Sequence, residues 1–155
     1  MSGKKEMQVS AIENGTVIDR IPSEKLFMVM SILGLDKVDT HTMTFGMNLR
    51  SNALSSKRKA IIKLWDRYLA DSEINKLALV SREIKINLIK DYEVVEKKEV
   101  EIPDKVYGIV KCMNPKCVTN CECVRTRFKA VSKEPFVLKC EYCETYMNEK
   151  QIEII

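Results

Sequence analysis

The sequence contains few of the residues on which enzymes rely for catalysis. Its only histidine is His41, in an alternating polar and apolar segment where a lone histidine is more often a packed or surface residue than a base. There is no GxSxG sequence, and the five glycines never form the GxxxxGKS/T or GxGxxG patterns whose loops cradle phosphates. We therefore predict that the chain is not an enzyme.

Long apolar runs and an excess of one charge are also missing. The apolar stretches are far shorter than the roughly 20 residues that span a membrane, and the opening MSGKKE lacks the apolar region of a signal peptide. The 26 basic and 22 acidic residues are mixed along the chain, with a net charge of +4. This balance allows an anionic ligand but does not argue for nucleic acid. We expect a cytoplasmic protein with reduced thiols and no membrane partner.

All six cysteines lie between Cys112 and Cys143. Cys112 and Cys117 form a CxxxxC pair, and Cys140 and Cys143 form a CxxC pair. Two such turns at the ends of a short ribbon can supply four thiolates to one tetrahedral Zn²⁺. A disulfide framework or buried free cysteines are the alternatives, and a reducing compartment disfavours the first.

The segregation of the cysteines predicts two domains, residues 1–103 and 104–155, with the boundary near Pro103. The second is too small to bury a large core, and a structural zinc ion, which contributes about 10–16 kcal/mol in small metal domains, can replace it. Cys121 and Cys123 are two residues apart and would point to opposite faces of a strand, so we predict that they are not ligands.

Residue periodicity in the first hundred residues predicts strands and helices in the order strand, helix, strand, strand, helix, strand. Strands are expected at 7–12, 16–21, 41–48, 84–89 and 92–95, with a turn at Lys90–Asp91, and helices at 23–33 and from an N-cap at Asp71 to Ser81. Residues 57–65 suit either a helix or a strand, and 97–101 read as a charged linker. The order predicts an α+β fold, a ferredoxin-like sandwich with two helices on one face of an antiparallel sheet, followed by an all-β zinc ribbon.

If residues 57–65 form a strand, Lys59 and Lys63 lie on one side of it, about 13 Å apart at roughly 3.3 Å per residue. Lysines at that separation can flank an anion several atoms long, such as a triphosphate, although a solvated lysine face is the alternative. Asp19 and Asn87 are polar groups of the kind that fix a ribose or a base, but nothing in the pattern groups them.

A second basic segment lies among the cysteines, where Arg125, Arg127 and Lys129 alternate with other residues. A strand with one basic face can meet nucleic acid or an acidic protein surface, or simply keep the protein soluble. Few aromatic residues accompany it, which weakens a base-stacking surface. A zinc-ribbon protein that binds nucleic acid is therefore the alternative function.

Several stretches together carry a resemblance to a known family. They are VSAI at 9–12 followed by GTVIDRIP at 15–22, GMNL at 46–49, DYEVV at 91–95, and the two cysteine pairs. GTVID and DYEVV are not general motifs of any fold, so their joint presence is specific. These stretches are spread over nearly the whole chain. Through them the chain resembles the regulatory chain of aspartate carbamoyltransferase.

The resemblance implies a non-catalytic, allosteric subunit of pyrimidine biosynthesis, with a nucleotide-binding domain joined to a zinc domain that contacts catalytic chains. It implies that residues 57–65 form a strand, that Zn²⁺ is held by the four paired cysteines, and that CTP and ATP, with UTP as a further candidate, are effectors. Lys59, Lys63 and Lys97 would take the phosphates, and Asp19 and Asn87 the sugar or base. The matching effector positions are Val9, Ala11, Ile12, Val17, Asp19, Arg20, Lys59, Ile61, Lys63, Asn87, Ile89, Tyr92, Val94 and Lys97.

The resemblance also implies partners and shows departures. Asn114 and Glu144 match residues that contact catalytic chains, and regulatory homodimers would bridge catalytic trimers in a dodecamer-like holoenzyme without nucleic acid. Arg20 stands where well-known relatives carry histidine, and residues 52–58 are changed beside the phosphate site, so effector choice is expected to differ. Cys121 and Cys123 are additional to the family pattern.

Overall fold

The structure is a computed structural model that describes residues 11–37, 42–51 and 58–155. The chain divides into two compact units, Met1–Val100 and Glu101–Ile155, each described by itself below. Most of the strand predicted at 7–12, together with His41 and residues 52–57, lies outside the described residues. In the described part, no helix is both long and apolar enough to cross a membrane.

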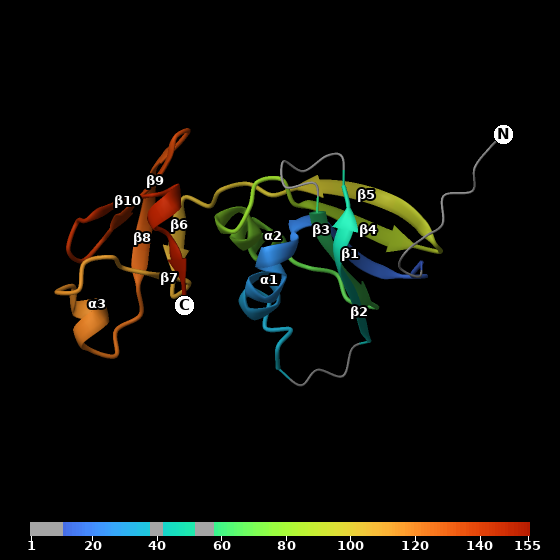
Figure 1. The fold of residues 1–155 in the computed structure, drawn as a ribbon, viewed down its shortest axis with the longest axis horizontal. Coiled ribbons are helices and arrows are strands. Elements are labelled where there is room, and N and C mark those ends of the chain that lie inside the picture. Colours follow the sequence, from blue (N-terminus) through green and yellow to red (C-terminus); the bar gives the residue numbers. More distant parts are fainter. Residues whose placement is uncertain (1–10, 38–41, 52–57) are drawn as a thin grey trace. The chain divides into compact units, whose positions relative to one another are not determined.

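The first unit is a five-stranded antiparallel sheet in the order β2-β3-β1-β4-β5 (Figure 1). Its elements in chain order are β1 (Gly15–Pro22), the 3-10 turn η1 (Ser23–Lys25), α1 (Leu26–Ile32), β2 (Met43–Arg50), β3 (Arg58–Trp65), α2 (Asp71–Lys76), the 3-10 turn η2 (Leu77–Leu79), β4 (Lys85–Lys90) and β5 (Glu93–Glu99). This is the predicted ferredoxin-like order, with the strand predicted at 92–95 forming β5 at the edge beside β4, and the ambiguous segment is a strand.

The central strand β1 shows why the sheet has two different faces. Ile18 lies opposite Ile62 of β3 and Ile86 of β4, and all three are fully buried. α1 and α2 cover one face of the sheet (Figure 1), and we assign these buried residues to that face. The next residues along each strand point to the other face, because side chains alternate at a period of two. The sheet thus has an apolar layer under the helices, and the side chains of its other face are free to be polar.

Gly15 starts β1 where the chain passes against β3. Its φ is +141°, and a Cβ atom there would lie 1.9 Å from the backbone oxygen of Leu64. Only glycine fits this approach, which is what allows β1 to enter between β3 and β4. The GTVID motif therefore begins with a residue that the backbone requires.

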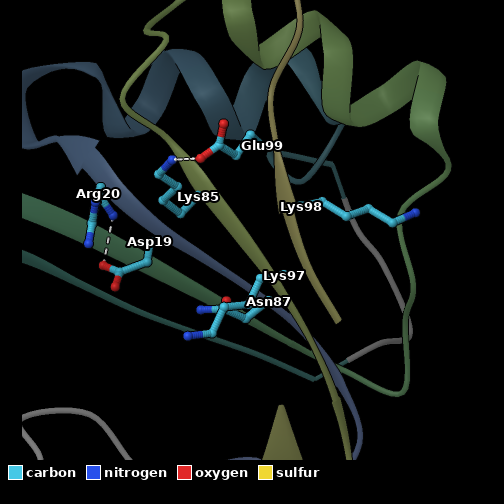
Figure 2. A pocket seen from close by; sticks show the side chains of 7 residues that line it. All are labelled: Asp19, Arg20, Lys85, Asn87, Lys97, Lys98 and Glu99. Atoms are coloured by element: carbon cyan, nitrogen blue, oxygen red, sulfur yellow. Dashed lines mark hydrogen bonds and ion pairs between the residues drawn. The ribbon is translucent and has the colours of Figure 1, made fainter. Parts of the chain in front are cut away.

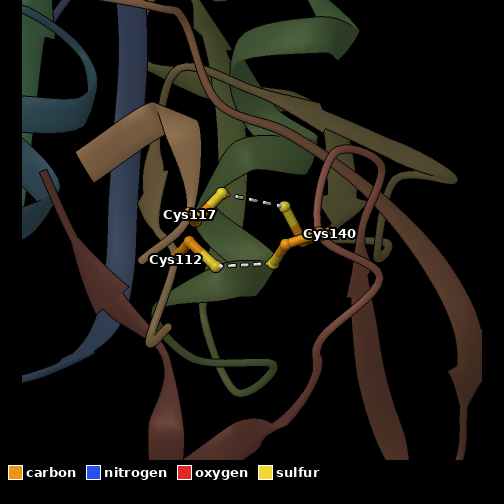
Figure 3. Close-up of side chains that lie close together, drawn as sticks. Cys112, Cys117 and Cys140 are labelled. Carbon is orange, nitrogen blue, oxygen red and sulfur yellow. Dashed lines mark hydrogen bonds between the residues drawn. The ribbon is translucent and has the colours of Figure 1, made fainter. Parts of the chain in front are cut away.

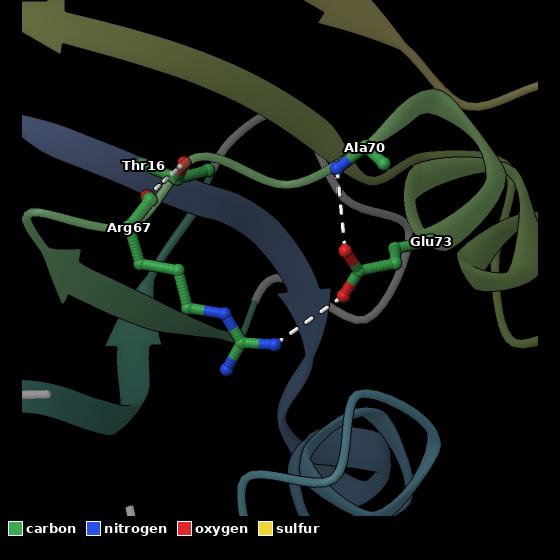
Figure 4. A network of polar contacts seen from close by, with 4 residues as sticks. All are labelled: Thr16, Arg67, Ala70 and Glu73. Atoms are coloured by element: carbon green, nitrogen blue, oxygen red, sulfur yellow. Dashed lines mark hydrogen bonds and ion pairs between the residues drawn. The ribbon is translucent and has the colours of Figure 1, made fainter. Parts of the chain in front are cut away.

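A network of polar contacts ties β1 to the start of α2 (Figure 4). The buried Thr16 hydroxyl donates to the carbonyl of Arg67 at 2.7 Å, and the Arg67 guanidinium lies 3.3 Å from Glu73. The other Glu73 oxygen accepts the N–H of Ala70 at 3.3 Å. The prediction that Asp71 is the N-cap is therefore wrong by one residue. Ala70 is the N-cap and offers no side-chain acceptor to the first helical N–H groups, while Glu73 accepts the N–H of Ala70 itself.

Both ends of β5 also differ from the sequence prediction. The β4–β5 hairpin turns at Asp91 and Tyr92, with φ of +50° and +65°, rather than at Lys90–Asp91. Two consecutive residues with positive φ match the twist of a tight hairpin. β5 continues to Glu99, so most of the predicted charged linker is strand, because its residues pair with β4.

The second unit has a four-stranded sheet in the order β10-β9-β8-β6 and a two-stranded sheet of β7 and β11. Its elements are β6 (Lys105–Tyr107), β7 (Val110–Lys111), α3 (Val118–Cys121), β8 (Arg127–Lys133), β9 (Phe136–Cys140), β10 (Tyr146–Asn148), the 3-10 turn η3 (Glu149–Gln151) and β11 (Glu153–Ile154). Phe128, Leu138 and Met147 are fully buried and form a small core. The predicted ribbon is confirmed, with the four-residue helix α3 added.

Candidate functional sites

The second unit brings four cysteine sulfurs together from its two predicted turns. The ligand atoms of Cys112, Cys117, Cys140 and Cys143 all lie within 4.8 Å of one another (Figure 3). The sulfur of Cys112 lies 3.5 Å from that of Cys143, and Cys117 lies 3.8 Å from Cys140. A disulfide needs about 2.05 Å, whereas ligands about 2.3 Å from a tetrahedral metal lie about 3.8 Å apart. The cluster therefore has the geometry of a tetrathiolate metal site, not of a disulfide pair.

The surroundings of these thiols differ. Burial raises the pKa of the Cys112 thiol to about 12, and burial likewise raises the pKa of Cys140. At Cys143 burial acts in the same direction, but hydrogen bonding led by the Thr145 hydroxyl, 3.1 Å away, outweighs it and lowers the pKa to about 6. Deprotonating buried thiols side by side needs a positive charge between them, which a bound cation supplies.

Local hydrogen bonds shape the first cysteine turn. The Asn114 side chain accepts the N–H of Lys116 at 3.0 Å, and its carbonyl accepts the N–H of Cys117 at 3.0 Å. Asn120 donates its amide to the carbonyls of Cys112 and Asn114, at 2.9 and 2.7 Å. Asn114, predicted from the resemblance as an interface residue, is thus also a structural part of this turn.

The second turn presents Glu144 at the surface. Its N–H donates to the carbonyl of Cys140 at 3.0 Å, and its φ is +63°. The carboxylate is exposed and lies 3.9 Å from the Lys139 ammonium. Glu144 is therefore placed by the closing turn of the cysteine cluster.

Cys121 and Cys123 lie outside the cluster, and both are exposed. Their predicted place in a strand is wrong, because Cys121 ends α3 and β8 begins only at Arg127. Their predicted role as non-ligands agrees with their position outside the four sulfurs. The predicted basic face of this segment is reduced to Arg127 and Lys129, both exposed on β8.

On the first unit, the sheet face opposite the helices carries a cross-strand row of predicted effector residues. Lys63 of β3 lies opposite Val17 of β1, Val17 lies opposite Asn87 of β4, and Asn87 lies opposite Lys97 of β5. Residues directly opposite in an antiparallel pair share a face, so four strands contribute to one line of side chains. Positions separated by up to 80 residues are brought together in this way.

One end of this face is apolar. Ile12, Val17 and Ile89 form a buried cluster, against which Ile61 and Trp65 pack. The predicted residue Val94 lies opposite Ile89 on β5 and is exposed. This end of the face is therefore mainly apolar.

The segment before β1 lies beside the β4–β5 hairpin at this end. The N–H of Tyr92 donates to the carbonyl of Glu13 at 2.9 Å, and Asn14 accepts the N–H of Asp91 at 3.2 Å. Ala11, in the segment before β1, and Tyr92, in the hairpin, are both exposed. Both belong to the predicted effector set.

The other end of the face is an open pocket of about 540 Å³ that contains most of the charge. It is lined by Asp19, Arg20, Lys85, Asn87, Lys97, Lys98 and Glu99 (Figure 2). Asp19 and Arg20 line it together although they are neighbours, because β1 has a register shift between Ile18 and Ile21 and Arg20 has a φ of +57°. A bulge of this kind turns two consecutive side chains toward one site.

The two predicted lysines of β3 lie in different surroundings. The Lys59 ammonium lies 2.8 Å from the carboxylate of Asp19. Lys63 is only 5% exposed, so it is not part of a solvated lysine face. Burial lowers the pKa of Lys63, and the nearby Asp19 carboxylate only partly opposes this. A buried cation of this kind is stabilised by an anion placed beside it.

Sequence reasoning missed three residues that line the pocket, Lys85, Lys98 and Glu99. Lys85 and Glu99 lie opposite each other on β4 and β5, and Lys85 also lies opposite Asp19. The signal was present in the sequence, since Lys85 is two residues before Asn87 and Glu99 is two after Lys97. Lys98 also lines the pocket, but its side chain points away from the others toward Asp71, 2.8 Å away (Figure 2).

These features define a class of protein: a two-unit binding protein, with a polar ligand face on a ferredoxin-like sandwich and a metal site in a small β unit. Residues 7–101 match the family described as the aspartate carbamoyltransferase regulatory chain, allosteric domain, and residues 104–153 match its metal binding domain. The chain belongs to the family of aspartate carbamoyltransferase regulatory chains. It is a non-catalytic, regulatory subunit with an allosteric and a metal-binding domain.

Curated relatives agree over nearly the whole chain. The aspartate carbamoyltransferase regulatory chain of Bacteroides fragilis is 51% identical over 152 residues, which cover 98% of this chain and 97% of the relative. The regulatory chain of Porphyromonas gingivalis is 45% identical over 98% of this chain and 99% of the relative. That of Thermococcus sibiricus is 47% identical over 96% of each chain.

Proposed function

We propose that the first unit binds nucleotide effectors on the sheet face opposite the helices and that the second unit passes the change to a catalytic chain. The observation that supports this most is the row Lys63, Val17, Asn87 and Lys97. It joins an apolar end, suited to a base, to a charged pocket, suited to phosphates. The predicted effectors are CTP and ATP, with UTP as a further candidate.

Each part of the ligand has a proposed set of partners. The base packs against the apolar end, with Ala11, Ile12, Ile89, Tyr92 and Val94, and Val9 is the matching position outside the described residues. Asp19 and Asn87 bind the sugar or base, and Lys59, Lys63 and Lys97 bring positive charge to the phosphates. Arg20 lines the charged pocket, so its guanidinium is available to the phosphates.

The metal in the second unit is proposed to be Zn²⁺. A tetrahedral set of four sulfurs is typical of zinc or of iron–sulfur centres. Separations of 3.5 and 3.8 Å suit one ion at the centre of Cys112, Cys117, Cys140 and Cys143. Four thiolates leave no open coordination position, so the ion stabilises the fold and does not catalyse.

The partners follow from the regulatory character of the family. We expect the cytoplasmic chain to form homodimers that bridge catalytic trimers of aspartate carbamoyltransferase in a dodecamer-like assembly of pyrimidine biosynthesis. Asn114 and Glu144, which the two cysteine turns position, are the proposed contacts. The functional boundary is proposed at 1–103 and 104–155, so that residues 104–155 form the docking domain.

The coupling between nucleotide and catalytic chain is a free energy, typically about 1–3 kcal/mol, and for binding it is reciprocal. A nucleotide that binds one quaternary state more tightly shifts the equilibrium toward that state. The two states are two quaternary arrangements of the whole assembly, not two conformations of this chain alone.

The test is reconstitution with the native catalytic chain, followed by carbamoyltransferase activity with CTP, ATP and UTP. We expect co-purification, activity that responds to at least one nucleotide, and weaker nucleotide binding by Lys63→Ala in calorimetry. Lys90→Ala is the matched control, because Lys90 is exposed on β4 and alternation places it on the other face. Unchanged CTP and ATP affinity in Lys63→Ala would show that the site is wrongly assigned.

The alternative, a nucleic-acid-binding zinc ribbon, has a separate readout. It predicts a gel shift with nucleic acid that weakens steeply with salt. The exposed Arg127 and Lys129 are its main support. Co-purification with the catalytic chain without such a shift excludes it.

A further inference from the structure

We propose that Lys85 is a further phosphate-binding residue of the nucleotide pocket and that Glu99 is an internal competitor which the phosphates displace from it. The inference rests on the proposed nucleotide binding by the first unit. It concerns two residues that the resemblance did not assign.

The geometry places both side chains in the pocket. Lys85 lies two residues before Asn87 on β4, and Glu99 lies two residues after Lys97 on β5, so both share the face of the effector row. Lys85 and Glu99 lie directly opposite each other, and their side chains form an ion pair (Figure 2). Together with Asp19, opposite Lys85 on the other side, they form a second row of alternating charge beside the first.

In the Lys85–Glu99 ion pair, a ligand phosphate can take the place of Glu99. The Lys85 side chain is 33% exposed, whereas that of Glu99 is 77% exposed. An exposed carboxylate gains little from a surface ion pair, because water and salt screen it. Swinging Glu99 into solvent therefore costs little, while Lys85 stays at the pocket.

Other pocket cations are not masked in the same way. The Lys98 ammonium pairs with Asp71 at the start of α2, so it points away from the ligand site. Lys97 has no ion pair in the described part of the chain. Lys85 is therefore the pocket cation held by a carboxylate that also lines the pocket.

Glu99 competes throughout the physiological pH range. The hydrogen bond and charge of Lys85, together with the charge of Arg20, lower the pKa of the Glu99 carboxyl. The group thus stays ionised near neutral pH. The Glu99 carboxylate pairs with Lys85, and its negative charge also repels phosphates. This repulsion grows with the charge of the ligand.

The expected consequence is a site that discriminates by phosphate number. A triphosphate extends farther than a monophosphate and carries more charge, so it gains more from Lys85 once Glu99 has moved. Removing the charge of Glu99 should therefore strengthen CTP binding more than CMP binding. Removing the charge of Lys85 should weaken CTP binding more than CMP binding.

The test uses the full chain and isothermal titration calorimetry with CTP and CMP. Glu99→Gln should tighten CTP binding by about three- to ten-fold at low salt, with a smaller gain for CMP. The control is Glu96→Gln, which removes the same charge from the same strand but lies outside the residues that line the pocket, with its carboxylate 3.9 Å from Lys98. It should change CTP affinity by less than about two-fold.

Lys85→Gln supplies an independent arm. It should weaken CTP binding, and in the Lys85→Gln background Glu99→Gln should lose most of its effect, because the occupied cation is gone. Equal tightening by Glu99→Gln and Glu96→Gln, no change in Glu99→Gln, or an undiminished effect in the double variant would overturn the inference. If wild-type protein binds neither nucleotide, the proposed function itself fails, and that result is distinct from the others.

Discussion

The ammonium of Lys59 on β3 lies 2.8 Å from the carboxylate of Asp19 on β1, across a bulge that shifts the register between the two strands. Both side chains are about three-quarters buried. The pair joins Lys59 to Asp19, which lines the charged pocket, and it links two residues that the sequence could only propose separately.

Breaking this pair should destabilise the first unit modestly. We expect Lys59→Met and Asp19→Asn to show a coupling of about 1 kcal/mol in a double-mutant cycle. Urea unfolding followed by fluorescence measures it, since the only tryptophan, Trp65, lies in this unit. Additive effects of the two substitutions would show that the contact contributes nothing to stability.

Lys63 should show the opposite sign, because its burial disfavours the charge. We expect Lys63→Met to raise the free energy of unfolding by about 1 kcal/mol at pH 7 while weakening nucleotide binding. Since the folded-state pKa of Lys63 is lowered, the unfolded chain binds more protons between that pKa and about 10.5. Wild-type stability should therefore rise relative to Lys63→Met as pH increases through this range.

Urea titrations of both proteins at pH 7 and pH 10 check this. A difference that stays constant with pH would contradict the assignment of the penalty to the Lys63 ammonium. Lys90→Met serves as the control, because Lys90 is exposed and should show little change at either pH.

The sequence predicted the order of elements, the fold class and the four clustered cysteines because these depend on periodicity and spacing. The metal set is local: two short turns carry all four sulfurs. The effector face is not local, since Val17, Lys63, Asn87 and Lys97 meet only through strand order and register. The spacing of Lys85 from Asn87 and of Glu99 from Lys97 indicates a shared face, but only the strand register shows that Lys85 and Glu99 lie opposite each other.

The corrected start of α2 leads to a third prediction. Glu73→Ala removes the acceptor for the Ala70 N–H and the partner of Arg67, and should lower stability of the first unit by about 1 kcal/mol. Asp71→Ala, which removes only an exposed partner of Lys98, should cost less than about 0.5 kcal/mol. Thermal unfolding monitored by Trp65 fluorescence compares them, and equal losses would contradict the larger contribution expected of Glu73.

The cysteine cluster gives the last prediction. Cys140→Ser replaces a fully buried cysteine of the cluster, so a metal ion held there would lose one of its four thiolates. Because the small unit depends on the ion for a contribution of about 10–16 kcal/mol, we expect loss of metal and unfolding of residues 101–155. Trp65 fluorescence should still report a folded first unit, since the clustered sulfurs all lie in the second.

Cys121→Ser is the matched control, because Cys121 is exposed and lies outside the four sulfurs. It should retain one zinc ion per chain by elemental analysis and should still assemble with catalytic chains. Normal zinc content in Cys140→Ser would contradict a tetrathiolate site, and loss of zinc in Cys121→Ser would show that the ligand set is different. Because both variants replace one thiol by one hydroxyl, only the position of the sulfur separates the two outcomes.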